Sequence, residues 1–311
     1  MKVPAAGPRA STGAIHEPPC RLRSFAETGE GRLISRPVPA RRVREPHALR
    51  RGTMGCMPSP ADFYDDLSST YHHLYPDWGV AVSEQGRALH GVLCRYQGPG
   101  PHTILDAATG IGTQLLGLAA HGHHLCGSDV SRAAVRRART ECAVRKVAGA
   151  FTVSDLRALP YDKGSFDAVI CADNAVAHLL SDRDVTLALG ELRRVARPGG
   201  LVLVSTRDYE EARQVHPTGT PPQVSKADRL QTVTFQVWDW QPDGKQYDLQ
   251  HFQLAGEGGD WVVSRRTSRL WAITRSELTE SARRAGLENV HWLMPAESRF
   301  FQPLLIARAP L

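Results

Sequence analysis

Apolar and polar positions alternate in two different ways along this chain, and the change falls near Arg207. Between residues 102 and 206, short apolar runs rich in Val, Ile and Leu alternate with longer stretches whose apolar residues recur at helical spacing. This alternation predicts strands that alternate with helices, and therefore a parallel sheet with helices on both faces. The strands expected here cover residues 103–105, 123–129, 150–155, 166–172 and 201–205.

The helices are expected where a capping residue precedes an amphipathic stretch. Within the alternating part they begin near Thr113, after Ser131 (to about 147) and at 182 (to 195). Two more precede the sheet, one after Ser59 or Asp62 and one at about 80–96.

Beyond Arg207 the apolar positions follow a period of two, which is typical of half-buried antiparallel strands. The runs cover 232–240, 247–254 and 261–273, and an Asp-Gly turn at 243–244 joins the first two. Asp-Gly between two such runs is a strong hairpin signal, so we expect a small added antiparallel sheet. A helix at 274–285 and strands at about 288–293 and 300–307 then complete the main sheet.

The charge of the chain is unevenly distributed. The net charge is +6, but the first 57 residues hold 11 of the 38 basic and 4 of the 32 acidic residues, which leaves 27 basic and 28 acidic residues for the rest. A near-neutral body disfavours a nucleic-acid or membrane partner. The six cysteines form no Cys-x-x-Cys pair, so we expect neither a metal site nor a disulfide framework. With no apolar run of about 18 residues and no secretory signal, the sequence predicts a cytoplasmic protein.

Residues 103–119 have the form of a nucleotide site, with a buried strand, a glycine turn and a helix start at the edge of a doubly wound sheet. A dinucleotide site has a third glycine three positions after Gly112, where this chain has Leu115. Asp106 at the strand end would repel a pyrophosphate and suits a cationic ligand. S-adenosylmethionine has an ammonium and a sulfonium and no phosphate, and Asp129 at the next strand end can accept both ribose hydroxyls. We therefore expect S-adenosylmethionine as the cofactor.

From about Asp62 to Leu311 the chain resembles the class I S-adenosylmethionine-dependent methyltransferases. The resemblance rests on five segments in the family's order, residues 105–112, 127–131, 154–156, 166–170 and 192–200. It implies a Rossmann-like, doubly wound sheet of seven strands, mainly parallel with the last strand antiparallel. It also implies that Asp129 holds the ribose and that Asp155 reaches the adenine amino group. The cofactor-binding residues expected are Tyr64, Tyr71, Trp78, Asp106, Ala107, Ala108, Gly110, Gly112, Asp129, Val130, Ser154, Asp155, Leu156 and Asp173.

Two further segments are similar to the glycine and sarcosine N-methyltransferase group. Residues 173–179, Asp-Asn-Ala-Val-Ala-His-Leu, look like that group's Gly-Asn-Ser-x-Ala-His-Leu, and residues 206–209, Thr-Arg-Asp-Tyr, look like its His-Arg-Asn-Tyr. The resemblance implies that Asn174 and Arg207 bind the substrate, the arginine through a carboxylate. It also implies that a helix over Tyr64–Trp78 forms a lid above the cofactor.

The chain departs from this group at three places. Thr109 stands where a cysteine is usual, and Asp173 replaces a glycine. Glu84-Gln85 occupy about the place of an arginine that in relatives can hold the methionine carboxylate.

On this basis we divide the chain into an extension, 1–57, and a methyltransferase domain, 58–311. The extension is rich in Pro, Arg, Gly and Ser and is expected to be disordered and basic, because it cannot bury enough apolar surface to offset ordering entropy. Alternatives are an upstream extension before a start at Met54 or Met57, a transit peptide and a weak nucleic-acid patch. Within the domain we expect a helical lid at 58–98, a cofactor-binding core at 99–206, antiparallel strands capping the substrate at 207–273 and final elements at 274–311.

Methyl transfer from a sulfonium needs a neutral, correctly aimed nucleophile, so proximity and orientation should supply most of the acceleration. His178 and Tyr71 are the candidate catalytic residues, the histidine as a base suited to neutral pH and the tyrosine in a lid that excludes solvent and seats the cationic methyl. Each has a structural alternative, since His178 can bond backbone in its turn and Tyr71 can pack in a core. Tyr209 and Trp240 complete the expected substrate-binding residues, and Trp240 is also open to a core or interface role.

The sequence therefore predicts an S-adenosylmethionine-dependent methyltransferase that acts on an amine nitrogen beside a carboxylate in a small molecule. The oligomeric state stays open, including an assembly of identical chains. The nearest alternative is an oxygen or carbon methyltransferase of secondary metabolism. A nicotinamide-dependent oxidoreductase is disfavoured by Leu115, and a non-catalytic cofactor-binding protein is a further alternative.

Overall fold

The computed structural model describes residues 57–227, 230–257 and 260–311. The expected extension at 1–57 lies outside these ranges except for Met57. The helices are α1 (Pro60–Leu67), η1 (Tyr71–Leu74), α2 (Trp78–Gln97), α3 (Thr113–Ala119), α4 (Arg132–Val144), η2 (Ala175–His178), α5 (Asp182–Val195), α6 (Tyr209–Val215), α7 (Arg275–Arg284) and α8 (Pro295–Ser298). The strands are β1 (Thr103–Asp106), β2 (His124–Asp129), β3 (Ala150–Val153), β4 (Phe166–Cys171), β5 (Ala196–Ser205), β6 (Gln223–Ala227), β7 (Leu230–Trp240), β8 (Gln246–Glu257), β9 (Asp260–Trp271), β10 (Glu288–Leu293) and β11 (Leu304–Arg308).

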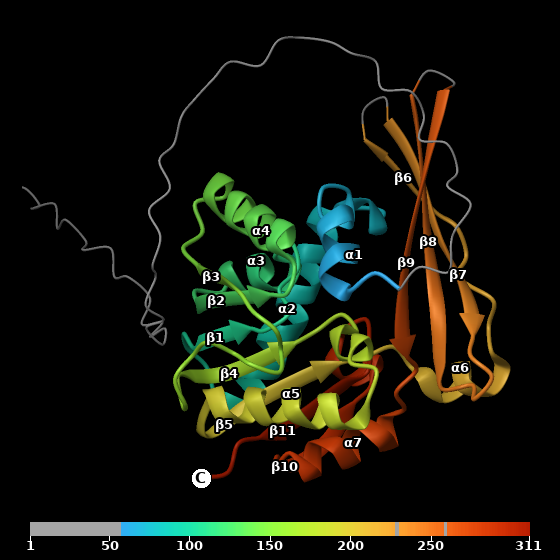
Figure 1. Ribbon diagram of the computed structural model, residues 1–311. Coiled ribbons are helices and arrows are strands. Elements are labelled where there is room, and N and C mark those ends of the chain that lie inside the picture. The colour runs from blue at the N-terminus through green and yellow to red at the C-terminus, as the bar shows by residue number, and fades with distance from the viewer. Residues whose placement is uncertain (1–56, 228–229, 258–259) are drawn as a thin grey trace, which may run out of the picture.

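The main sheet of the described residues has seven strands in the order β10-β11-β5-β4-β1-β2-β3 (Figure 1). β1 pairs in parallel with β2 and with β4, and β3 and β5 continue the parallel pairing on either side. β11 is antiparallel to both β5 and β10. The strand order changes direction beside β1, and such a change leaves a crevice at the carboxyl ends of the strands. The predicted seven-stranded, mainly parallel sheet with an antiparallel last strand is confirmed.

Helices cover both faces of the main sheet, and successive strand residues alternate between two cores. On β4, Val169 belongs to the core completed by α5 and α7, whereas Ile170 belongs to the core formed with α2 and α3. α2 lies directly against α3 where Gly86 and Gly117 meet. A Cβ on Gly86 would stand only 2.3 Å from the backbone carbon of Gly117, so the close approach requires glycine. α2 is therefore a layer of the core, and the segment before it is what overlies the site.

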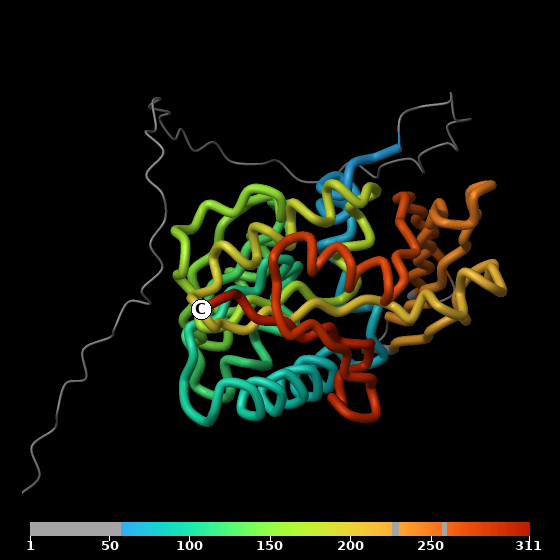
Figure 2. The backbone as a smooth tube through the Cα atoms, turned by 90° about the horizontal axis from the view of Figure 1, so that it is seen from below, coloured from blue at the N-terminus to red at the C-terminus, as the bar shows by residue number. Residues whose placement is uncertain are grey.

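A second, antiparallel sheet within the described ranges has four strands in the order β6-β7-β8-β9. The expected Asp-Gly turn at 243–244 joins β7 to β8. Figure 1 shows this sheet beside the end toward which the parallel strands point, and Figure 2 shows that it stands next to the main sheet rather than on its face. Phe63 and Leu67 of α1 pack with Trp238 of β7 and Tyr247 of β8 in a third core, which fixes α1 against these two strands of the second sheet.

Several local features differ from the prediction, among them the following three. The Tyr64–Trp78 segment is not one helix, because α1 ends at Leu67 and the single turn η1 separates it from α2. β6 was not expected, since its sequence is polar and it exists through pairing with β7. α6 was also missed, although Asp208 caps it by accepting a hydrogen bond from the amide of Glu210 at 3.3 Å.

Candidate active site

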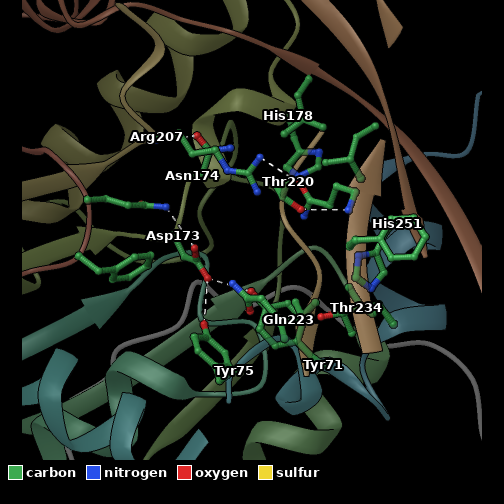
Figure 3. Close-up of a pocket in the computed structure, with 18 of the residues that line it drawn as sticks. Tyr71, Tyr75, Asp173, Asn174, His178, Arg207, Thr220, Gln223, Thr234 and His251 are labelled. Carbon is green, nitrogen blue, oxygen red and sulfur yellow. Dashed lines mark hydrogen bonds between the residues drawn. The ribbon is translucent and has the colours of Figure 1, made fainter. Parts of the chain in front are cut away.

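Two adjoining cavities lie between the carboxyl edge of the main sheet and the second sheet. The first encloses about 480 Å³ at the ends of β1, β2, β3 and β4. The second encloses about 590 Å³ between the ends of β4 and β5 and the strands of the second sheet, and it is shown in Figure 3. Four residues line both cavities, Tyr64, Tyr71, Asp173 and His178. The cavities therefore meet at one junction, where a group on one ligand can face a group on another.

The glycine turn after β1 is fixed by the acid that ends β2. Gly110 and Gly112 have φ angles of +53° and +94°, which glycine adopts without the penalty of a side chain. The Asp129 carboxylate accepts hydrogen bonds from the amide of Gly110 at 2.9 Å and from that of Ser131 at 2.8 Å. Burial raises the pKa of Asp129, and these amides oppose the rise. Two carboxylate oxygens offer about four acceptor positions, so the acid can still accept ligand hydroxyls from the first cavity.

Asp106 is a buried acid at the end of β1, with 1% of its surface exposed. Neither carboxylate oxygen makes a hydrogen bond of normal geometry to another described residue. Burial raises the pKa of Asp106 to about 7, while the Thr109 side chain and the amide of Ala108 oppose the rise. A buried carboxyl group without a cationic partner is costly, and a ligand cation nearby would offset that cost. The site therefore fits S-adenosylmethionine, which is cationic, and not a pyrophosphate.

Most of the predicted cofactor-binding residues line the first cavity, namely Tyr64, Tyr71, Ala107, Ala108, Gly110, Asp129, Val130, Ser154, Asp155, Leu156 and Asp173. Asp106 and Gly112 lie behind this wall. Trp78 lines neither cavity, because it begins α2 and its indole Nε1 donates to the Thr113 hydroxyl at 2.9 Å. The expected contact of Trp78 with the cofactor therefore does not fit the geometry.

Several wall residues of the first cavity were missed by sequence reasoning, and Arg157 is the charged one that contacts a predicted site residue. Arg157 lines the cavity, and its Nη2 donates to Asp155 Oδ2 at 2.7 Å. This bond is the main reason that the pKa of Asp155 lies below its usual value. Arg157 also contacts Asp184 at 3.1 Å. The acid expected to reach the adenine amino group thus already has a basic partner.

The junction is built by tyrosines from α1 and from the segment around η1 that face the turn after β4. Tyr71 and Tyr75 each donate a hydroxyl hydrogen bond to Asp173 Oδ2, at 2.9 and 3.1 Å (Figure 3). The hydroxyl of Tyr64 lies 2.9 Å from Nε2 of His178. The overlying segment is therefore tied to the main sheet through the side chains that separate the two cavities.

His178 is held by two hydroxyl groups. Besides Tyr64 at Nε2, the Ser268 hydroxyl lies 3.3 Å from its Nδ1. Burial, with a smaller contribution from Arg207, lowers the pKa of His178 to about 4. An imidazole with this pKa holds a proton too weakly to serve as a base for an ammonium. The geometry favours the structural role over the catalytic one.

Arg207 enters the second cavity from the end of β5. Its Nη1 donates to Gln236 Oε1 at 3.1 Å and to the Tyr247 hydroxyl at 3.4 Å, and its guanidinium lies 5.1 Å from the ring centre of Trp238. Among the described residues it forms no ion pair with an acid. A partly buried guanidinium held only by neutral groups is suited to a planar anion such as a carboxylate.

Asn174 lines the second cavity, but its side chain already has protein partners. Its Nδ2 donates to the Tyr209 hydroxyl at 2.9 Å, and its Oδ1 accepts from the Thr206 hydroxyl at 2.9 Å and from the Arg207 amide at 3.1 Å. Asn174 therefore connects the ends of β4 and β5 and fixes the start of the Arg207 segment. One N–H of its amide remains for a ligand.

Two predicted substrate residues line neither cavity. Tyr209 is 1% exposed and bonded to Asn174, and Trp240 donates its indole N–H to the carbonyl of Pro217 at 2.9 Å. The second sheet instead contributes Gln236 and His251, which are opposite each other in the β7–β8 register. The sequence held a signal for Gln236: it lies four residues before the predicted Trp240, and side chains that alternate with a period of two place both on the same face of the strand.

Two absences concern only the residues that the structure describes. No three of their His, Cys, Asp or Glu side chains are grouped so as to hold a metal ion. None of their helices combines the length and the apolar character needed to cross a membrane.

Comparison with known proteins agrees with this architecture. The profile of the family described as "Methyltransferase domain" matches residues 104–200. A glycine/sarcosine N-methyltransferase from Parasynechococcus marenigrum is 29% identical over 150 residues, which cover 48% of this chain and 52% of the relative. A malonyl-(acyl-carrier protein) O-methyltransferase from Erwinia pyrifoliae is 38% identical over 112 residues, 36% of this chain and 40% of the relative. The chain spans about half the length of the curated relatives it matches.

Among solved structures, an amino pentose methyltransferase from Micromonospora echinaspora superposes with a TM-score of 0.64 at 17% identity, covering 78% of this chain and 96% of the other. At that identity the likeness concerns the fold. The chain therefore shares the fold of that methyltransferase, and residues 104–200, which include the strands at the first cavity, match the methyltransferase-domain family. The matched relatives include an N-methyltransferase and an O-methyltransferase, so the similarity leaves the acceptor open.

Proposed function

We propose that this protein transfers a methyl group from S-adenosylmethionine to the amine nitrogen of a small acceptor that carries a carboxylate. The observation that carries the proposal is the pair of cavities that meet at Tyr64, Tyr71, Asp173 and His178. The first has buried acids and suits a cationic nucleotide, and the second has a guanidinium without an acidic partner.

In the first cavity, Asp129 would hold the ribose hydroxyls while its two amide contacts keep the carboxylate oriented. Asp106 would face positive charge from behind the turn, since no other described group neutralises it. Hydrogen bonds from the ribose hydroxyls to the Asp129 carboxylate would be charge-assisted, and such bonds are among the strongest that a protein makes. Both roles use the chain's own acids and need no phosphate-binding residue.

In the second cavity, Arg207 would bind the acceptor carboxylate. Gln236 and Tyr247 hold one edge of the guanidinium, and Trp238 covers its face, so the group is oriented before a ligand arrives. The cavity volume of about 590 Å³ is some twenty times the ~30 Å³ that one water occupies in the liquid. Glycine has only five non-hydrogen atoms, so the cavity has room for acceptors much larger than glycine.

When bound, S-adenosylmethionine supplies an electrophilic methyl group on a sulfonium. The contribution of the chain is to orient the acceptor and to exclude water from the junction. Tyr64 and Tyr71 stand over the junction and are fixed by hydrogen bonds to His178 and Asp173. The aromatic rings also offer π faces to positive charge.

The proposal is tested by incubating the full chain with S-adenosylmethionine and a panel of acceptors and measuring release of S-adenosylhomocysteine. The panel contains glycine, sarcosine, β-alanine, 4-aminobutyrate and larger amino carboxylates, with 4-hydroxybenzoate and simple phenols as hydroxyl acceptors. We expect release that depends on at least one amino carboxylate. Release with hydroxyl acceptors alone, or no release although calorimetry shows cofactor binding, would contradict the proposal.

A further inference from the structure

We propose that Asp173 is a catalytic residue that holds the acceptor nitrogen at the junction, rather than the cofactor ligand that the sequence predicts. The proposal rests on the proposed function and adds to it that the acceptor binds as a zwitterion, with its ammonium at Asp173 and its carboxylate at Arg207. The position, the contacts and the backbone of Asp173 support it.

Asp173 is the one acid among the described residues that lines both cavities. The other acids of the first cavity are Asp129, Asp155 and Asp184, and the other acid of the second is Asp208. Each of these acids is bound by a backbone amide or an arginine outside the junction. Asp173 is therefore the acid whose negative charge can face a ligand in either cavity.

The contacts of Asp173 leave its charge without a cationic partner. Tyr71 and Tyr75 donate to Oδ2, and Gln302 Nε2 donates to Oδ1 at 3.4 Å (Figure 3). Burial and the charge of Asp173 raise the pKa of both tyrosines, so their hydroxyls stay protonated and continue to donate. No described Lys, Arg or His forms an ion pair with this carboxylate. An acid held in this way still has an acceptor position on Oδ1 for an ammonium.

The backbone at Asp173 also indicates function. Its φ angle is +55°, in the left-handed region, and the resembled N-methyltransferase group has glycine at this place. A side chain there costs on the order of 1 kcal/mol that glycine avoids, although aspartate tolerates the conformation better than most residues. The amide of Asp173 is fixed by a hydrogen bond to the Ser205 hydroxyl at 2.8 Å. The chain thus retains a strained acid where the backbone itself favours glycine.

Asp173 and Arg207 carry opposite charges in the same cavity, and neither has an ion-pair partner in the described ranges. Because only Asp173 also borders the first cavity, a zwitterion bound between them has its nitrogen toward the methyl donor. The ammonium first loses one proton to solvent, and its lone pair then forms the N–C bond as the S–C bond breaks and leaves its electron pair on sulfur. Positive charge moves from sulfur to nitrogen, where the carboxylate of Asp173 faces it.

The test compares binding of zwitterions with that of matched acids that lack the amine, in the presence of S-adenosylhomocysteine. The pairs are glycine with acetate, β-alanine with propionate and 4-aminobutyrate with butyrate. In the unmodified protein we expect at least one zwitterion to bind about tenfold or more tightly than its partner, and in Asp173→Asn we expect this difference to disappear. The affinity for S-adenosylmethionine should change less than about threefold.

Asp208→Asn is the matched control. Asp208 lines the second cavity but is paired with Arg275, and asparagine can still cap α6, so the preference for the zwitterion should remain. Asp173→Gly, which suits the local backbone, serves as a second variant if the melting temperature of Asp173→Asn falls. No zwitterion preference in the unmodified protein, its persistence in both Asp173 variants, or an equal loss of cofactor affinity would overturn the proposal. Failure of methyl transfer with the preference intact would instead contradict the proposed function.

Discussion

The two cavities differ in how they are assembled. The first is formed mainly by residues that follow strands β1 to β4 of one sheet, with residues of α1 and η1 over them. The second combines α1, η1, the turns after β4 and β5, the second sheet and the segment around α8, which are far apart in the chain. A site built on strand ends can be inferred from local motifs, whereas a site built from separate segments depends on their packing.

The charges of the two cavities differ as well. Acids dominate the first, where Asp129 and Asp155 stand at its wall with Asp106 behind it. Arg207 is the partly buried cation of the second, and Asp173 stands where the cavities meet. If this division is correct, a substitution on one side should affect one ligand and spare the other.

The largest effect is expected in the first cavity. Asp129→Ala should weaken S-adenosylmethionine binding by about 100-fold or more, because it removes the proposed charged acceptor of two ribose hydroxyls, each hydrogen bond being worth roughly 1.5–3 kcal/mol. Calorimetry measures the affinity. Asp184→Asn, at the same cavity but paired with Arg157, is the control and should stay within about threefold. Unchanged affinity in Asp129→Ala would remove this residue from the cofactor site.

On the second side, Arg207→Lys should raise the KM of a carboxylate-bearing acceptor by about tenfold, since an ammonium cannot make the two parallel hydrogen bonds of a guanidinium. Steady-state kinetics at saturating cofactor give the KM, and the cofactor affinity should not change. Arg269→Lys replaces an arginine of the second sheet that is paired with Asp248, and it controls for general effects. Equal losses of acceptor and cofactor binding would contradict the division between the cavities.

Low pH should lower the free energy of unfolding through the buried histidines of the second cavity. Burial lowers the pKa of His178 and of His251 to about 4, below the unfolded value of about 6.5. Between these two values the unfolded chain binds more protons than the folded chain. The free energy of unfolding is therefore highest above pH 6.5 and decreases as the pH falls toward 4. Urea unfolding should show a loss of about 1–2 kcal/mol per histidine at pH 5 relative to pH 7. His251→Gln should reduce this dependence, and an identical dependence in the variant would show that His251 does not titrate as described.

The smallest effect is expected at His178. His178→Gln should lower kcat by less than about tenfold, because loss of a general base costs roughly 10²–10⁴-fold. The profile of kcat/KM against pH should show no histidine limb between pH 6 and 7, since the imidazole is already neutral there. A larger loss together with disappearance of such a limb would restore the catalytic role.

The sequence predicted the main sheet because each strand and helix carries its own local signal, such as Ser131 as the cap of α4. Asp106 and Asp129 could be proposed as site residues for the same reason, since each ends a predicted strand. Trp78 was misplaced because the direction of its indole depends on Thr113 across the α2–α3 contact. The bonds from Tyr71 and Tyr75 to Asp173 join residues about 100 positions apart, and no periodicity reports such a contact. α6 was predictable in principle, from Asp208 followed by two glutamates.

The most direct test of the central claim is to follow the methyl group itself. S-adenosylmethionine with a ¹³C-labelled methyl is incubated with the full chain and the amino carboxylate that supports turnover, and the product is analysed by NMR and mass spectrometry. The account predicts one labelled methyl on nitrogen, with the carboxylate unmodified. Label on an oxygen or a carbon, or turnover that is indifferent to removal of the acceptor carboxylate, would contradict it.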